Sequence, residues 1–520
     1  MTVGRLARAA AIVALFGLLS RLLGFAREIV LAAAYGASGV TDAFVNSLMI
    51  VNAVAAVLLY TLVTLIIPTF QRERAEQGVD SAWRLVSALA AWVGLGLVAL
   101  ASAAAIWPEG PAALFRLDPV RAADTAELIR IMAPALALQG FSAIFTAMLQ
   151  IHGRFAGPAA IGVAFNLGII LGIVAGRGAI GIEAAGWGVT MGAAFQVILQ
   201  LPQFWRLLRE ARARPVLTHP RLGAVGMLAL PVLGASLLQQ VNSFTDKLFA
   251  SSLEAGRVAA LSFASALGQA PRVALLLPLL TPLFPLIARL MSERREAEAL
   301  DAFRRVAGLL GLLAMPIMLL LAIYAEEVTQ LAFQRGRCGE ECVRETSGPL
   351  TFYALALWPA FLSLLVNRTL SAANRQSAIL WTTGVTVALT IVLDVILLGP
   401  MEQSGLALAS TIGVYANVAM LLWLLRHHFP VLSIGALGSR QARMLLAAGI
   451  AAVVALALDQ VLPTDDRGSL EVAALLAVKV VVALGAFAVA VRVLARPELA
   501  DGLRAVRPLV TRRRSGGARG

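Results

Sequence analysis

The feature that most limits the fold of this chain is a series of long apolar segments that follow one another along almost its whole length. A membrane-spanning helix needs about 20 mostly apolar residues, because the hydrocarbon core of a bilayer is about 30 Å thick. Charged residues make up only 14% of the chain, whereas a soluble domain is about 25% charged. The sequence therefore predicts an all-α polytopic membrane protein with about fourteen transmembrane helices. These are expected at residues 7–34, 42–68, 83–107, 125–150, 157–176, 181–205, 223–252, 257–290, 304–325, 348–373, 376–399, 404–425, 441–462 and 469–495.

The net charge of +13 is informative through the positions of the basic residues. If the N-terminus lies inside, roughly three times as many arginines fall in inside loops as in outside loops. This is the pattern of the positive-inside rule, so the charge is explained without nucleic acid as a partner. Residues 497–520 form a basic cytoplasmic tail, which we expect to lie near anionic lipid headgroups.

The two halves of the chain resemble each other. The segment IIPTFQRERAEQGVDSAWRLVSALAAWVG contains Pro68, and LTPLFPLIARLMSERREAEALDAFRRVAGLLG carries Pro282 in the matching place. We therefore predict two parallel six-helix lobes, at residues 1–210 and 220–428, followed by two extra transmembrane helices at 440–496. Repeated halves are typical of transporters, which bind their substrate at the interface of the repeats.

Charged residues lie within the apolar segments of the first lobe, where each charge costs at least about 2.5–3.5 kcal/mol. Arg21, Arg27 and Glu28 occur in SRLLGFAREIVLAAAYG, and Asp42 and Asn52 follow in the next segment. Guanidinium groups match phosphate oxygens in a fork, so one interpretation is a cationic pocket for phosphate. The other is that Arg27 pairs with a carboxylate while Arg21 reaches the membrane interface. The residues alone leave both interpretations open.

The second half has its own polar residues within apolar segments. Carboxylates, an amide and hydroxyls are oxygen ligands of the kind that hard cations take. They form a candidate sodium or proton site, made of Asn242, Asp246, Asp394, Ser410 and Thr411. The alternative is an internal ion pair, either between Asp246 and Lys247 or between Asp394 and Arg368. Lys479, in the last predicted helix, either faces a groove or reaches the interface.

Motifs for enzymatic chemistry are missing from the sequence. It has no GxxxxGK[ST] loop, no HExxH and no plausible Ser–His–Asp set, so we expect neither ATP hydrolysis nor an intramembrane enzyme. The two cysteines, Cys338 and Cys342, have no nearby histidines and make a poor metal site. They either form a disulfide in a loop predicted to lie outside or remain thiols.

The stretch SRLLGFAREIVLAAAYGASGVTDAF resembles the N-terminal pattern of the MurJ/MviN lipid II flippase family of the MOP exporter superfamily. That pattern reads close to SR-x-LGF-x-R-[DE], followed by FGAG and TDAF. The matching residues here are Ser20-Arg21, Leu23-Gly24-Phe25, Arg27-Glu28, Tyr35-Gly36-Ala37 and Thr41-Asp42-Ala43-Phe44. The number of spans, the doubled lobes and the two extra spans agree with the family along nearly the whole chain.

The resemblance implies a flippase of the bacterial cytoplasmic (inner) membrane. It would move the peptidoglycan precursor lipid II, an undecaprenyl-pyrophosphate-linked disaccharide-pentapeptide, from the inner to the outer leaflet by alternating access. It implies that Arg21, Arg27, Asp42 and Asn52 serve substrate binding, and we expect either Glu28 or Asp42 to keep the arginines oriented when the site is empty. The polar residues of the second half fall about where some members bind sodium. No cofactor is expected beyond Na⁺ or H⁺ as a coupling ion, and cell-wall synthesis proteins are candidate partners.

The chain departs from the family at two positions. Ala55 and Ala266 stand where the family usually has arginines of its cavity, and Arg272 is a candidate partial substitute. The cavity is therefore expected to be less cationic than usual. Two alternatives follow: a flippase for another polyprenyl-linked glycan, such as an O-antigen or exopolysaccharide precursor, and a cation-coupled multidrug exporter.

Overall fold

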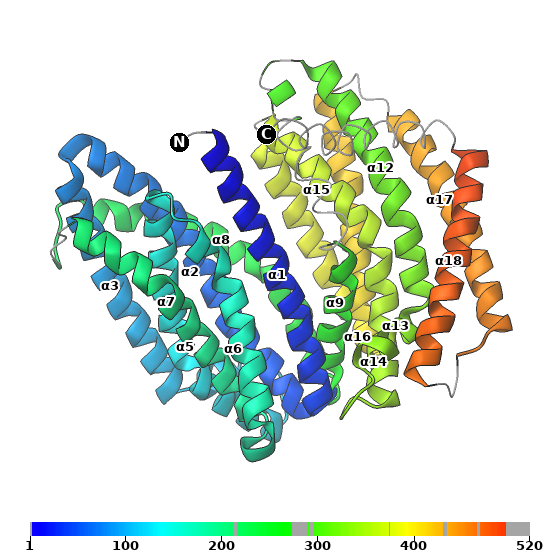
Figure 1. Ribbon diagram of the computed structural model, residues 1–520, viewed down its shortest axis with the longest axis horizontal. Coiled ribbons are helices and arrows are strands. Elements are labelled where there is room, and N and C mark those ends of the chain that lie inside the picture. The colour runs from blue at the N-terminus through cyan, green and yellow to red at the C-terminus, as the bar shows by residue number, and fades with distance from the viewer. Residues whose placement is uncertain are drawn as a thin grey trace, which may run out of the picture. The chain divides into compact units, whose positions relative to one another are not determined.

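The computed structural model describes residues 3–211, 216–272, 287, 289–291, 293, 295–373, 375–429, 434–464 and 468–495. Over these residues the chain forms helices and no strands, which confirms the predicted all-α class (Figure 1). By length and composition, ten of the described helices could span a membrane. The number is eleven if the bent pair α14 (Glu340–Leu355) and α15 (Leu357–Ala372) counts as one span.

Three features explain why this number is below the prediction. The predicted span at 223–252 falls on α8 (Leu222–Ala250), of which only the shorter stretch Leu222–Gly234 counts as an apolar helix. Helix α16 (Gln376–His428) runs through two of the predicted spans, which are separated by a break at Glu402, whose φ of 49° and ψ of −133° are not helical. The predicted span at 257–290 lies partly outside the described residues. The described helices are therefore compatible with about fourteen spans of the usual length.

The chain is divided into two compact units. The first comprises residues 1–259 and 335–339. Its helices are α1 (Val3–Tyr35), α2 (Gly39–Gln77), α3 (Val79–Ile106), the short α4 (Glu109–Ala112), α5 (Pro119–Ile151), α6 (Ala156–Ile180), α7 (Glu183–Ala211) and α8 (Leu222–Ala250). Helix α6 packs along both α1 and α7, and α2 packs against α5 and α8.

Glycines bring α6 and α7 into backbone contact. A Cβ atom on Gly168 would lie 2.3 Å from the Cα of Gly192, and one on Gly188 would lie 2.9 Å from the Cα of Ile169. Small residues permit this close approach between membrane helices, whose association depends on packing rather than on the hydrophobic effect. Helix α6, which also packs along α1, is therefore fixed closely against α7.

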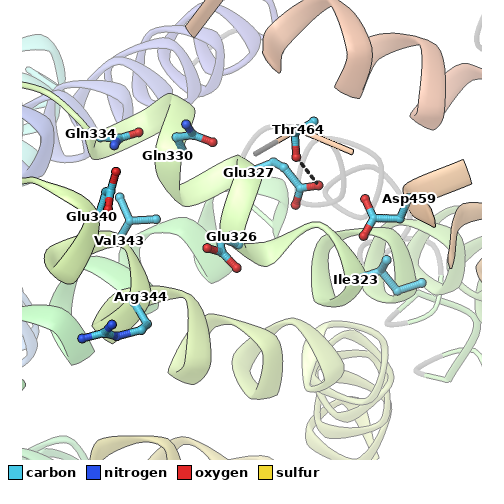
Figure 2. A pocket seen from close by; sticks show the side chains of 10 residues that line it. All are labelled: Ile323, Glu326, Glu327, Gln330, Gln334, Glu340, Val343, Arg344, Asp459 and Thr464. Carbon is cyan, nitrogen blue, oxygen red and sulfur yellow. Dashed lines mark hydrogen bonds between the residues drawn. The ribbon is translucent and has the colours of Figure 1, made fainter. Parts of the chain in front are cut away.

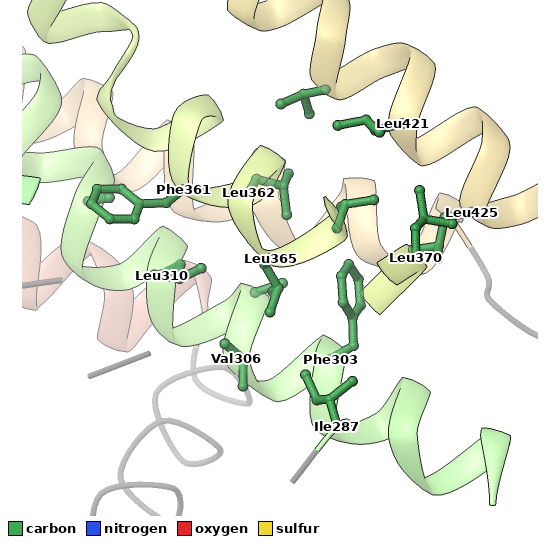
Figure 3. Close-up of a cluster of buried hydrophobic side chains, with 14 of the residues drawn as sticks. Ile287, Phe303, Val306, Leu310, Phe361, Leu362, Leu365, Leu370, Leu421 and Leu425 are labelled. Atoms are coloured by element: carbon green, nitrogen blue, oxygen red, sulfur yellow. The ribbon is translucent and has the colours of Figure 1, made fainter. Parts of the chain in front are cut away.

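The second unit comprises residues 260–334 and 340–520. It contains most of α9 (Arg257–Pro271), then α12 (Glu296–Ile323), α13 (Ala325–Phe333), α14, α15, α16, α17 (Ile434–Val461) and α18 (Ser469–Leu494). One apolar cluster of its described residues joins α12, α15 and the second part of α16, with Phe303, Phe361, Leu365 and Leu421 fully or almost fully buried (Figure 3). Helices α17 and α18 pack against each other, and α17 packs against α12.

The boundary between the units follows Ala259, so α8 belongs to the first unit. The predicted division into lobes at residues 1–210 and 220–428, with extra helices at 440–496, stays a prediction. The tail at 497–520 lies outside the described residues. Cys338 and Cys342 are disulfide-bonded, which decides between the two alternatives that the sequence left open.

Candidate functional site

Arg27 and Glu28 form an ion pair within the membrane-spanning part of α1. An Nη2 atom of Arg27 lies 2.5 Å from Oε1 of Glu28, and the side chains are only 16% and 8% exposed. At this depth an unpaired charge is expensive, so the pair explains how α1 can carry both groups. Arg27 thus has the carboxylate partner that one interpretation of the sequence required, while a phosphate-binding role for it stays a prediction.

Asn166 on α6 holds the other side of the Arg27 guanidinium. Its Oδ1 accepts a hydrogen bond from Nη1 of Arg27 at 3.2 Å, and its Nδ2 donates to the backbone carbonyls of Ser20 and Gly162 at 3.2 and 2.9 Å. Because both ends of the amide are engaged, its orientation is fixed. Asn166 is not among the site residues predicted from the sequence. The available signal was a lone amide in the apolar stretch AAIGVAFNLGIILG.

A second cation lies near this pair. Lys247 on α8 is within electrostatic range of Glu28, Arg27 and the adjacent Asp246. The first unit therefore brings two cationic and two anionic side chains together, from α1 and α8, with the amide of Asn166 beside them. Mixed clusters of this kind within a membrane mark substrate or ion pathways.

Arg21 and Asn52, two of the predicted binding residues, are exposed on α1 and α2. Among the described residues Arg21 has no hydrogen bond or ion pair. An exposed guanidinium on a membrane helix is available to an anionic ligand or headgroup, since it meets either a water-filled space or the interface. The predicted role of Arg21 and Asn52 in binding stays a prediction.

Asp42 occupies a different environment, because it is completely buried. Its Oδ2 accepts a hydrogen bond from the backbone N–H of Gly256, and its Oδ1 accepts one from Ala259, both at 2.7 Å. Arg121 lies 3.8 Å from the same carboxylate. Ala259 is in the first turn of α9, where backbone N–H groups lack partners within the helix. Asp42 therefore caps a helix that begins over 200 residues later in the chain.

Glycines make this capped junction possible. Gly256 has a φ of 94°, and a Cβ atom there would lie 2.6 Å from the carbonyl oxygen of Ala37. Gly336 has a φ of 61°, and its Cβ would lie 2.2 Å from the carbonyl oxygen of Ala33. Both positions require a residue that tolerates positive φ and has no side chain. The α1–α2 turn, the start of α9 and residues 335–337 thus meet in one tight junction.

The residues of the predicted sodium or proton site are not brought together as a described set. The side chain of Asn242 lies outside the described residues, and Asp246 belongs to the first unit. In the second unit Asp394 is completely buried on α16, and the hydroxyl of Thr411 lies 2.8 Å from the carbonyl oxygens of Phe352 and Ala407. Ser410 is partly exposed. This site stays a prediction.

Arg272, the candidate substitute for the missing arginines, lies in the second unit. Its guanidinium carbon is 5.8 Å from the centre of the Phe361 ring, a cation–π distance. This contact gives Arg272 an aromatic neighbour, and its predicted role in substrate binding stays a prediction.

The family model described as "Lipid II flippase MurJ" matches residues 31–468. A "Probable lipid II flippase MurJ" of Rhizobium meliloti is 27% identical over 420 residues, which cover 77% of each chain. A "Lipid II flippase MurJ" of Burkholderia cenocepacia is 28% identical over 359 residues, or 66% of this chain and 68% of that protein.

Solved structures support the same fold. One titled "Lipid II flippase MurJ, inward closed conformation" superposes with a TM-score of 0.78 at 17% identity, over 93% of this chain and 99% of that chain. An inward-facing multidrug resistance MATE transporter of the MOP superfamily gives a TM-score of 0.63 at 14% identity, over 81% and 95% of the two chains.

Proposed function

The chain belongs to the lipid II flippase MurJ family, and we propose that it moves lipid II from the inner to the outer leaflet by alternating access. It is a multi-pass protein of the bacterial inner membrane. Its place in peptidoglycan synthesis, and hence in cell-wall biogenesis and cell shape, follows from that activity. We further propose that both termini face the cytoplasm, as the distribution of arginines predicts, and that cell-wall synthesis proteins are its partners.

The observation that carries this proposal is the cluster of Arg27, Glu28 and Asn166. The pyrophosphate of lipid II is an anion, and guanidinium groups bind phosphate oxygens through paired, charge-assisted hydrogen bonds. Arg27 directs one Nη group to Glu28 and the other to Asn166, while its Nε has no hydrogen-bond partner among the described residues. The guanidinium is therefore held in place, with Nε as its one nitrogen that has no partner among the described residues.

Glu28 gives the site a way to exchange anions. In the empty site Glu28 neutralises Arg27, so no buried charge is left alone. When the pyrophosphate enters, it replaces Glu28 as the anionic partner of Arg27. When the substrate leaves on the other side, Glu28 returns. Because one anion replaces another, neither step leaves the guanidinium without a counter-ion in a low-dielectric environment.

Exposed residues supply a first contact for the substrate. Arg21 has no ion pair among the described residues and lies on the same helix as Arg27. We propose that it meets the pyrophosphate before Arg27 does, and that Asn52 contributes a hydrogen bond from α2. Asp42, whose two oxygens are already occupied by backbone N–H groups, is proposed to act by holding the α1–α2 junction.

A coupling ion is also proposed. Na⁺ or H⁺ would bind at the polar residues that the sequence predicts for it, which are Asn242, Asp246, Asp394, Ser410 and Thr411. The support is their chemistry, since carboxylate, amide and hydroxyl oxygens are ligands for hard cations. The ion would bias the equilibrium between inward and outward states by binding one of them more tightly.

Complementation tests the proposal. The chain is expressed in a bacterium whose own lipid II flippase is depleted, together with the variants Arg21→Ala and Arg27→Ala. We expect the parent to restore growth and Arg27→Ala to fail at equal membrane abundance. The matched control is Arg130→Ala, which removes an exposed arginine paired with Glu127 at the start of α5. This control should restore growth as the parent does.

The outcome also distinguishes lipid II from the alternative substrate, another polyprenyl-linked glycan. The replacement of two usual cavity arginines by Ala55 and Ala266 favours a different polyprenyl-linked glycan as the second candidate. Failure of the parent, with the protein folded in the membrane, would refute lipid II transport and favour that candidate. Restoration of an O-antigen or exopolysaccharide defect by the same chain would then support it.

A further inference from the structure

Lys479 on α18 is completely buried, with no exposed surface. Two carboxylates surround it. Its Nζ lies 2.5 Å from Oδ1 of Asp459 on α17 and 3.4 Å from Oε1 of Glu327 on α13. It also lies 5.4 Å from the centre of the Tyr324 ring. Of the two possibilities that the sequence left open, neither describes this lysine, because it is enclosed and paired.

The charges of this cluster do not balance. Two carboxylates share one ammonium group, so the three side chains carry a net charge of −1 when all are ionised. Because Lys479 and Glu327 are buried, an unbalanced charge on them is costly, and the uptake of one proton removes the imbalance. Glu327 is only 7% exposed, whereas the side chain of Asp459 is 44% exposed. Burial makes the charged form more costly for Glu327 than for Asp459, so the proton binds to Glu327.

The two ion pairs also differ in strength. The contact of Lys479 with Asp459 is short and lies within the α17–α18 pair, whereas the contact with Glu327 is longer and joins that pair to α13. Electrostatic attraction falls with distance. If Glu327 is neutralised, Lys479 keeps Asp459 as its partner and loses its ion pair with α13, so the remaining links between these helices are the apolar contacts around Val328 and the hydrogen bond from Tyr324 to Ala455.

An aqueous route reaches Glu327. A cavity of about 390 Å³ is lined by Ile323, Glu326, Glu327, Gln330, Gln334, Glu340, Val343, Arg344, Asp459 and Thr464. Figure 2 shows Glu327 directed toward Thr464 and Asp459, with Arg344 on the far side of the cavity. The hydroxyl of Thr464 is 3.4 Å from Oε1 of Glu327. The cavity lies in segments predicted to face outward, so water on that side can deliver the proton.

We propose that Glu327, Lys479 and Asp459 form a proton-binding site, and that binding of a proton from the outer aqueous phase releases the α17–α18 pair from α13. The site is separate from the five residues proposed above for a coupling ion. It does not depend on the identity of the transported lipid.

The surrounding groups agree with this assignment. Burial raises the pKa of Glu327, the negative charge of Asp459 raises it further, and Lys479 opposes the rise. Helix α13 has nine residues and is too short to span the membrane. Tyr324 stays neutral, because burial raises its pKa to about 12. The other charged groups that line the cavity are Glu326 on α13 and, on α14, Glu340 and Arg344, which carry opposite charges.

A distance measurement on the full-length protein in nanodiscs tests the proposal. Spin labels at Gln330→Cys on α13 and Val481→Cys on α18 report the separation of these helices as the pH falls from 8 to 5, without lipid II. We expect the distance distribution to lengthen or broaden in one transition. Glu327→Gln should give the released distribution at every pH. Asp459→Asn should move the transition down by about one pH unit or more, because Lys479 then serves Glu327 alone.

Glu326→Gln is the matched control. It removes an exposed carboxylate from the same helix and the same cavity, and it should leave the transition unchanged. A distribution that does not respond to pH, or a pH response that persists in Glu327→Gln, would overturn the proposal. If the transition occurs as expected in a protein that does not move lipid II, the proposed substrate is refuted and the proton site is still supported.

Discussion

The carboxylate of Asp42 accepts a hydrogen bond from the backbone N–H of Ala259 at 2.7 Å. This contact makes a residue at the start of α2 the cap of α9. Both carboxylate oxygens are used, because Gly256 donates to the second one. Sequence resemblance associates the TDAF segment with substrate binding. In the structure its Asp42 has a structural role, because it caps α9.

Removal of the cap should destabilise the protein. Asp42→Ala leaves two buried N–H groups without acceptors and is expected to lower the free energy of unfolding by about 2 kcal/mol. Asp42→Asn keeps one acceptor and should lose about half as much. Thermal unfolding of the purified variants in detergent measures both. Equal unfolding temperatures for Asp42→Ala and the parent would contradict the capping role.

Gly256 should resist substitution by alanine. Its φ of 94° and the closeness of the Ala37 carbonyl oxygen make Gly256→Ala destabilising by at least about 1 kcal/mol. Gly223→Ala on α8 is the matched control, since a Cβ there meets nothing within 4 Å and its φ is not positive. Alanine at position 223 should be neutral or slightly stabilising, because alanine favours a helix more than glycine does. Similar losses for both variants would argue against a special junction at Gly256.

Asn166 should act through Arg27. Asn166→Leu removes the amide that fixes the guanidinium and is expected to reduce lipid II transport by roughly tenfold or more, since small displacements of a positioning group are costly. The readout is the rate of transport into proteoliposomes at several substrate concentrations. An Arg27 that has lost its alignment should bind substrate more weakly. Leu167→Ala, at an exposed neighbouring position on α6, should behave as the parent does.

Glu28 should compete with the substrate for Arg27. Glu28→Gln removes the competing negative charge, so a lipid pyrophosphate should bind about tenfold more tightly. Turnover should fall, because the returning carboxylate no longer helps release. Binding measured by native mass spectrometry, together with transport rate, separates the two effects. Weaker binding at unchanged thermal stability would contradict the exchange of anions.

Sequence reasoning reached the helical class, the membrane location and the charged segment of α1, because these depend on composition and on neighbouring residues. Pairing of Arg27 with a carboxylate was one of the two interpretations that the sequence left open, and the carboxylate is that of the adjacent Glu28. Asp42 could not be placed, because its partners are backbone N–H groups 214 and 217 residues away, which carry no side-chain signature.

One partner of Lys479, Glu327, was hidden by its distance along the chain. Glu327 lies 152 residues earlier in the chain, on a nine-residue helix that was expected to be part of a loop. Asn166 was missed because one amide among apolar residues gives no periodic pattern. In each case the contact is set by how distant helices pack, and no local property of the sequence determines that.

The central claim is that this chain moves lipid II through a site built on Arg27. Its most direct test is transport of fluorescently labelled lipid II across proteoliposomes that contain only the purified chain, compared with Arg27→Lys and Arg27→Ala. We predict transport by the parent, a reduced rate for Arg27→Lys, which keeps the charge but loses the fork, and at least a tenfold slower rate for Arg27→Ala. An inactive parent, or an Arg27→Ala variant as fast as the parent, would contradict the claim.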